Sequence, residues 1–155
     1  MTRRRPGCAV EVAAVTALPA QAVWDVLADA HSFATWVVGT KQIRGATADW
    51  PCVGSALYHR WGPVPFRVRD RSVVTASVAP SRLELEAGAR PVALVRIRIV
   101  LTAVPDGTRV VLDENIVRGL ALVAPPLTRR VQRWRNRRGL QQLLRLAQTR
   151  SEQGR

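Results

Sequence analysis

The stretch LVRIRIVLTAVPDGTRVVLDENIVR, residues 94–118, contains two runs of alternating residues joined by a turn signal. In the first run, apolar residues from Val95 to Leu101 alternate with Arg96 and Arg98, as in a strand with one buried face. The dipeptide at 106–107, Asp-Gly, is a strong signal for a tight hairpin turn. In the second run one face carries Val110, Leu112, Glu114 and Ile116. The stretch therefore predicts an antiparallel hairpin with one mainly apolar face.

Outward from this hairpin, the same two-residue period recurs in shorter stretches upstream. They lie at residues 10–14, near 43, and at 57–61, 66–71 and 82–86. Short strands joined by tight turns favour an antiparallel meander. In such a meander the strand with Glu84 and Glu86 lies between two arginine-bearing strands, so we expect cross-strand ion pairs on the solvent face.

Helical spacing appears in two places. Pro19 suits the first turn of a helix over residues 19–30, and Ser32 can cap a second short helix that ends near Gly39. The last segment repeats apolar residues at helical spacing over about 23 residues, a length of roughly 35 Å. Its apolar residues are Leu127, Val131, Trp134, Leu140, Leu143, Leu144 and Ala147.

These elements predict an α+β fold in which a curved antiparallel sheet of about seven strands wraps around a long C-terminal helix. Two short helices lie between the first and second strands. We expect residues 1–7 to form a basic, flexible arm, residues 8–149 a single domain, and residues 150–155 a tail. The size of 155 residues and the hydrophobic fraction of 47% suit one globular domain.

Composition and charge exclude several classes of protein. No apolar run approaches ~18 residues, the basic start lacks a following apolar run, and Cys8 and Cys52 make no disulfide framework. We therefore expect a cytoplasmic protein with reduced thiols. The net charge of +13 is uneven, because residues 6–126 carry 12 basic and 10 acidic groups while residues 127–155 carry nine arginines and one acidic residue.

The order of elements and several local stretches together resemble the SRPBCC superfamily, in a bacterial branch of polyketide cyclase/dehydrase type. The stretches are residues 23–29 (VWDVLAD), Trp36, Ile43-Arg44, Trp50-Pro51 with Gly54, 59–62 (HRWG), Gly107-Thr108 with Glu114, and Arg135-Asn136 before Leu140. The resemblance covers roughly residues 8–148. It implies the helix-grip fold, which START-related proteins share, and a pocket for a hydrophobic ligand, but no single reaction.

A curved sheet wrapped on one helix tends to leave space that its own side chains do not fill. We expect the ligand cavity to be lined by residues on the inward faces of the strands and helices. These are Trp36, Leu57, His59, Trp61, Phe66, Val68, Leu83, Leu85, Val95, Ile97, Ile99, Leu112, Glu114, Ile116, Val131 and Asn136.

Two ionisable residues, His59 and Glu114, fall on apolar strand faces and are candidates for catalysis. Burial favours the neutral form of each, so the two could act as an acid/base pair in an aldol-type cyclisation or a dehydration. The alternatives are that backbone groups, water or an arginine satisfy them, or that they orient the polar end of a ligand. Asp70 also points inward unless a bulge turns it.

Three functions follow, and whether the protein is an enzyme stays open. The first is binding of a lipid, polyketide or similar molecule; the second is a cyclase or dehydratase acting in the same cavity. The third is contact with anionic membrane or nucleic acid through the last helix, by Arg129, Arg130, Arg133, Arg137 and Arg138. No phosphate loop, metal constellation, nucleophile elbow or nucleic-acid motif is recognisable, so we expect no cofactor, no metal and no specific nucleic acid. We expect a monomer or a weak homodimer.

Overall fold

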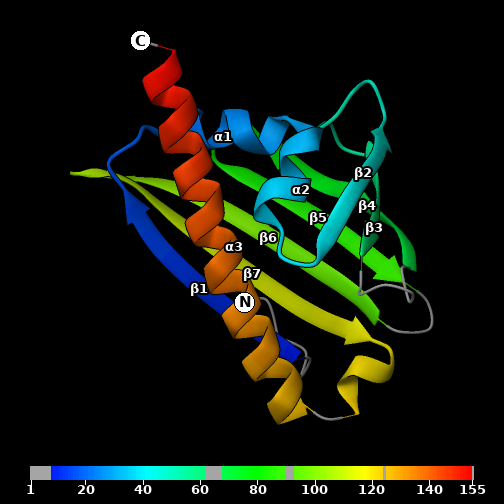
Figure 1. Cartoon of the computed structure of the whole chain (residues 1–155). Coiled ribbons are helices and arrows are strands. Elements are labelled where there is room, and N and C mark those ends of the chain that lie inside the picture. Colours follow the sequence, from blue (N-terminus) through cyan, green and yellow to red (C-terminus); the bar gives the residue numbers. More distant parts are fainter. Residues whose placement is uncertain (1–7, 62–67, 90–92, 124, 155) are drawn as a thin grey trace.

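A single antiparallel sheet of seven strands forms the body of the computed structural model (Figure 1). The structure describes residues 8–61, 68–89, 93–123 and 125–154. The strands are β1 (Cys8–Thr16), β2 (Thr40–Ala46), β3 (Ala56–Trp61), β4 (Val68–Val78), β5 (Arg82–Ala89), β6 (Ala93–Val104) and β7 (Gly107–Arg118). Their order across the sheet is β1-β7-β6-β5-β4-β3-β2, the expected meander with β1 added beside β7.

Strands β6 and β7 form the hairpin predicted for residues 94–118, and its register sets the inward face of the sheet. Ile97 pairs with Glu114 and Ile99 pairs with Leu112, so directly opposed residues share a face. Gly107 begins β7 with a φ of 137°, a conformation that L side chains rarely adopt. A Cβ at this position would lie 2.0 Å from the carbonyl oxygen of Thr16, so the turn also requires the missing side chain.

Short helices connect β1 to β2 and cover one end of the concave face, as expected. They are α1 (Ala20–Ala28), the 3-10 turn η1 (Ala30–Ser32) and α2 (Phe33–Trp36). The Ser32 hydroxyl does not cap α2 as the sequence suggested. It donates instead to the carbonyl of Val26 at 2.6 Å, which ties η1 to α1.

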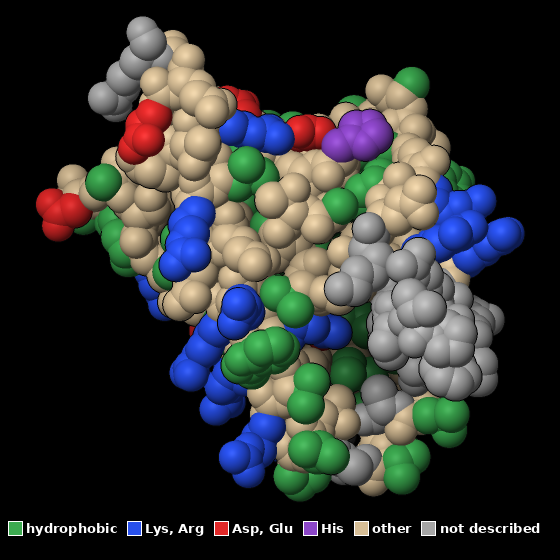
Figure 2. Space-filling model, viewed as in Figure 1, with side chains coloured by type: hydrophobic (Ala, Val, Ile, Leu, Met, Phe, Trp, Pro, Cys, Tyr) green, Lys and Arg blue, Asp and Glu red, His purple; other side chains and the backbone are tan. Residues whose placement is uncertain are grey.

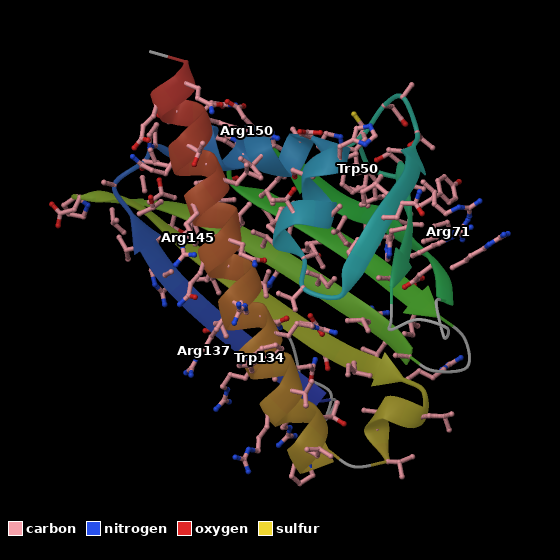
Figure 3. All side chains as sticks on the ribbon, viewed as in Figure 1. Trp50, Arg71, Trp134, Arg137, Arg145 and Arg150 are labelled. Carbon is pink, nitrogen blue, oxygen red and sulfur yellow. The ribbon has the colours of Figure 1, made fainter. Side chains whose placement is uncertain are left out.

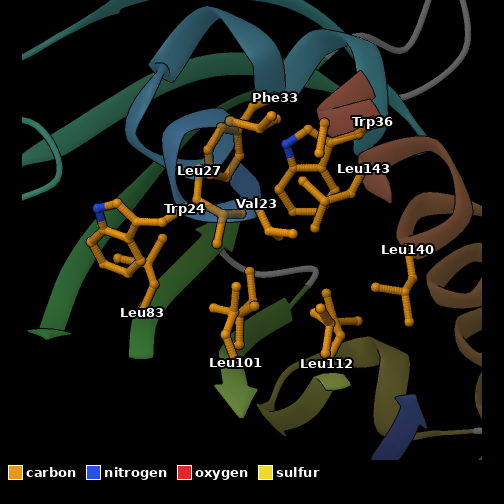
Figure 4. Packing of buried hydrophobic residues seen from close by; sticks show 14 of the residues in the cluster. Val23, Trp24, Leu27, Phe33, Trp36, Leu83, Leu101, Leu112, Leu140 and Leu143 are labelled. Carbon is orange, nitrogen blue, oxygen red and sulfur yellow. The ribbon is translucent and has the colours of Figure 1, made fainter. Parts of the chain in front are cut away.

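The hydrophobic core lies between these short helices, the part of the sheet that they cover and the second half of the last helix (Figure 4). Leu83, Ile99 and Leu112 contribute from the strands, and Val23 and Leu27 from α1. Each of the five is between 0% and 3% exposed. At about 25 cal/mol per Å² of buried apolar surface, this cluster supplies much of the stabilising free energy of the fold.

The last helix, α3 (Pro125–Gln153), crosses the concave side of the sheet over β1 and β7 (Figure 1). It has 29 residues rather than the expected 23 or so, since it begins at the paired prolines and continues past residue 149. Gly139 allows close approach, because a Cβ there would lie 3.0 Å from the carbonyl oxygen of Trp36 in α2. A final 3-10 turn, η2 (Leu120–Leu122), precedes the helix.

The two halves of α3 turn different kinds of side chain toward the sheet. In the second half Leu140, Leu143 and Ala147 are buried, as expected. In the first half the buried residues are Gln132 and Asn136. Leu127, Val131 and Trp134 are 65%, 53% and 58% exposed, so the expectation that they continue the packed stripe is wrong. At 100° per residue Trp134 and Leu143, nine positions apart, lie about 180° apart around the helix.

The convex face of the sheet carries cross-strand pairs of opposite charge, of which the pair between Arg96 and Glu86 is an expected one, whereas Arg98 pairs with Asp113 on β7. Arg96 Nε lies 3.2 Å from Glu86 Oε2 across β5 and β6, and Arg98 lies 3.7 Å from Asp113 across β6 and β7. All four side chains are substantially exposed, so each pair contributes at most about 1 kcal/mol.

Candidate ligand-binding site

The candidate site is the part of the concave face that the first half of α3 covers, and it borders the packed core, to which Val10, Leu85 and Val74 belong. One row across the sheet there consists of Val10, Glu114, Ile97, Leu85 and Val74, as the pairing register places them side by side. Glu114 is the one charged residue of this row. A carboxyl group among apolar neighbours needs a partner, so its contacts decide what the row can do.

Glu114 is held by two side chains of α3. The residue as a whole is 4% exposed. Its carboxyl group accepts a hydrogen bond of 3.1 Å from Gln132 Nε2 and forms an ion pair with the guanidinium of Arg135. Among the partners that the sequence left open for a buried Glu114, the structure shows an arginine, together with Gln132. The pair joins β7 to the first half of α3, where the helix turns polar rather than apolar side chains toward the sheet.

His59 on β3 is 9% exposed and is hydrogen-bonded to Ser72 on β4, with 2.9 Å between Nε2 and Oγ. Burial lowers the pKa of this histidine below its usual value, and the negative charge of nearby Asp70 opposes the shift only in part. The imidazole is therefore neutral at neutral pH. Its Nδ1 atom is buried and has no hydrogen-bond partner among the described residues.

Asp70 lies directly opposite His59 in the register, and so shares its face of the sheet. Its carboxylate does not bond the imidazole. Instead Oδ1 accepts the backbone N–H groups of Arg71 at 2.6 Å and Gly88 at 3.1 Å, which links β4 to β5. Asp70 therefore acts on His59 through its charge.

His59 and Glu114 are not neighbours. Three strands, β4, β5 and β6, separate β3 from β7. At about 4.8 Å per strand the two residues lie about 19 Å apart along the sheet. They could reach the two ends of one elongated molecule, but they are not placed to exchange a proton with each other.

Two further inward polar atoms lack a hydrogen-bond partner among the described residues. They are Nδ2 of Asn136 on α3 and Nε1 of Trp36 on α2, and both side chains are buried. Since a buried unpaired donor costs about 1–3 kcal/mol, each is a place where a guest could form a hydrogen bond.

The expected lining residues divide into four groups. Most are buried and face inward: Trp36, Leu57, His59, Leu83, Leu85, Ile99, Leu112, Glu114, Ile116 and Asn136. Val95 and Ile97 are only half-buried, as is Ile43, which pairs with His59. Val131 faces solvent, so its place in the lining is wrong. Phe66 and the side chains of Trp61 and Val68 lie outside the described residues, as does the arm at 1–7.

A second feature, on the outward side of α3, is a shallow groove among arginines. It is lined by Arg129, Arg130, Arg133, Trp134, Arg137, Arg138 and Gln141. Lys and Arg side chains gather over this half of the helix around a group of hydrophobic side chains (Figure 2). Trp134 and Arg137 point away from the sheet (Figure 3), so this groove is separate from the inward site.

Sequence reasoning missed Ser72, Gln132 and Arg135 as members of the inward site. Ser72 alternates with Val74 on its strand and could have been placed inward by that period. Gln132 and Arg135 could have been found from Glu114, because a buried carboxylate requires donors and the last helix is its nearest cover.

Within the described chain no group of three or more His, Cys, Asp or Glu residues is arranged to hold a metal ion. No helix among the described residues combines the length and apolar character needed to cross a membrane.

The sequence and fold are similar to those of known proteins. A family model described as polyketide cyclase / dehydrase and lipid transport matches residues 7–148. A search of curated proteins found no match to this sequence. Among solved structures, protein CV1439 from Chromobacterium violaceum is similar, with a TM-score of 0.69, 15% identity and coverage of 92% of this chain and 98% of that one.

Two further structures extend the comparison. The di-domain ARO/CYC protein StfQ from the steffimycin biosynthetic pathway has a TM-score of 0.76 at 11% identity, over 94% of this chain and 52% of that one. Ara h 8.0201 has a TM-score of 0.72 at 8% identity, over 91% and 97%. Identities this low show a shared fold, while the family match spans nearly the whole chain. The chain therefore belongs to the polyketide cyclase/dehydrase and lipid-transport family, within the SRPBCC superfamily.

Proposed function

We propose that this protein binds a small, mainly hydrophobic molecule between the sheet and the first half of α3. The family supports a role in ligand binding or cyclisation. Half-buried apolar side chains of Val95 and Ile97 face inward here and would gain burial from a guest. Ile43 is also half-buried but lies beside His59, towards the opposite edge of the sheet. The identity of the guest is constrained by the polar atoms among them.

The observation that carries the proposal is the set of unpaired buried polar atoms. Asn136 Nδ2 and Trp36 Nε1 are donors, so each would donate a hydrogen bond to an oxygen of a guest. His59 Nδ1 is a donor if Ser72 donates to Nε2, and an acceptor if Nε2 donates to Ser72. A carbonyl- or hydroxyl-bearing molecule with an apolar body satisfies both requirements, whereas a plain hydrocarbon leaves these atoms unpaired.

Native mass spectrometry of gently purified protein tests this proposal. We expect co-purified small molecules of reproducible mass, and less of them with the variants His59→Phe and Asn136→Leu. Tyr58→Phe is the matched control, since Tyr58 neighbours His59 on β3 but is 40% exposed. Protein that is empty in every preparation, or variants that retain as much ligand as the control, would refute ligand binding at this site.

The second candidate function is a polyketide cyclase or dehydratase in the same space, and the environment of His59 favours it. A neutral imidazole oriented by Ser72 is suited to accept a proton from an activated carbon or hydroxyl group. Glu114 is already paired with Arg135, so its place in this scheme is to orient the far end of a long substrate.

Turnover of a poly-β-keto substrate separates the two functions. As a cyclase, the protein should lose most of its rate in His59→Ala, while Glu114→Gln should raise KM more than it lowers kcat. Ligand retention without turnover in the unaltered protein would leave binding as the function. Turnover that survives in both variants would remove the catalytic assignment.

A further inference from the structure

The outward side of the first half of α3 carries apolar residues where a solvated helix normally has polar ones. Leu127, Val131 and Trp134 are 65%, 53% and 58% exposed. Their spacing of four and three residues places them in one stripe along the helix. Leu120 in η2 and Val123 just after it, 64% and 80% exposed, extend the apolar area beside the start of α3. A contiguous exposed apolar area of this kind marks an interaction surface.

Arginines border this stripe. Arg130, Arg133, Arg137 and Arg138 are exposed, and the guanidinium of Arg138 lies 5.9 Å from the ring of Trp134. The sequence contains no acidic residue from 115 to 151, so the helix itself offers these arginines no counter-charge before its end. The ion pairs that α3 makes with other elements of the described chain use Arg135 and Arg150, which lie outside this surface.

We propose that this arginine–tryptophan surface (Leu127, Arg130, Val131, Arg133, Trp134 and Arg137) docks on a bilayer that contains anionic lipid. Arginine beside exposed tryptophan and leucine matches a membrane interface, where phosphates meet acyl chains. A second copy of the chain would bring arginines against arginines. A nucleic acid would neutralise the arginines but leave Leu127 and Val131 without an apolar partner.

The position of the surface on α3 adds to this argument. The same helix segment presents Gln132, Arg135 and Asn136 to the interior and Val131 and Trp134 to the outside. A membrane-bound first half of α3 would therefore place the candidate ligand site one helix diameter, about 10 Å, from the lipid headgroups. That arrangement suits the uptake or delivery of an apolar molecule.

Vesicle co-sedimentation with the full chain tests the proposal. We expect binding to phosphatidylcholine vesicles containing 30% phosphatidylglycerol, little binding to pure phosphatidylcholine, and weakening as salt is raised. Arg133→Gln/Arg137→Gln should bind about 30-fold more weakly, at about 1 kcal/mol for each arginine. The matched control Arg71→Gln/Arg109→Gln removes the same charge from exposed positions on the strands, and should change binding by less than about threefold.

Brominated lipids test insertion of the tryptophan directly. Fluorescence should be quenched in the unaltered protein, and the quenching should be largely lost in Trp134→Phe while that variant still binds. Equal binding to neutral and anionic vesicles would overturn the proposal. So would a loss of vesicle binding that is as large in the control Arg71→Gln/Arg109→Gln as in Arg133→Gln/Arg137→Gln. So would tighter binding to a DNA duplex than to vesicles at the same salt, or a dimer in sedimentation velocity that Trp134→Ser dissociates.

This surface and the interior site are tested separately. If the protein retains a ligand but does not bind vesicles, only the proposed docking surface is overturned. A protein that binds vesicles but is always empty would overturn only the proposed ligand function.

Discussion

Removing the guanidinium of Arg135 should destabilise the protein, because it leaves the carboxyl group of Glu114 buried with Gln132 as its remaining donor among the described residues. Losing one partner of a fully buried ion pair costs about 3–5 kcal/mol. The Glu114 side chain is 6% exposed but that of Arg135 is 36% exposed, so water screens one side of the pair. We therefore expect Arg135→Met to lower the free energy of unfolding by about 2 kcal/mol.

Urea unfolding of a double-mutant cycle measures this directly. Glu114→Met/Arg135→Met removes both charges and leaves an apolar row of similar volume, so it should be more stable than Arg135→Met alone. For a chain of this size, 2 kcal/mol corresponds to a fall in Tm of about 4–8 °C. A loss below about 0.5 kcal/mol in Arg135→Met would show that the pair does not hold α3 to β7, and that the reasoning is wrong.

Three further predictions concern the interior and the turn. The lowered pKa of His59 means that the unfolded chain takes up a proton first on acidification. Stability should therefore fall as pH drops below about 6.5, and Tm measured from pH 8 to 5 should depend less on pH in His59→Phe. Gly107→Ala should cost more than about 3 kcal/mol in urea, since its Cβ would meet the Thr16 carbonyl at 2.0 Å; a loss under 1 kcal/mol would mean that the turn relaxes. Leu143→Ala should cost about 2–5 kcal/mol and Val131→Ala less than about 0.5, and similar losses would contradict the observed helix orientation.

The inward face of each strand could be predicted from residue alternation. The period of two in β5, β6 and β7 assigns Leu85, Ile97 and Glu114 to one side without reference to any other element. Two polar members of the candidate site, His59 and Glu114, were found in this way. Their partners were not found in this way. Ser72 and Arg135 belong to other elements, and only tertiary packing brings them within contact distance of His59 and Glu114.

The main wrong prediction concerns which side of α3 faces the sheet, and the reason is physical. The helix carries two apolar stripes: one through Val131 and Trp134, the other through Leu140 and Leu143. Helical period alone cannot choose between stripes on opposite sides. The buried carboxyl group of Glu114 favours Gln132 and Arg135 as its cover, and this turns Trp134 to solvent.

The sequence by itself determined the order of elements, the faces of the strands and the accumulation of arginines on the last helix, because these properties are local and periodic. Only the tertiary structure decided that three strands lie between His59 and Glu114, and that the first half of α3 is polar inside and apolar outside. Both depend on how one element is rotated and placed against another. That choice follows from satisfying buried polar groups across the whole fold, which no single segment encodes.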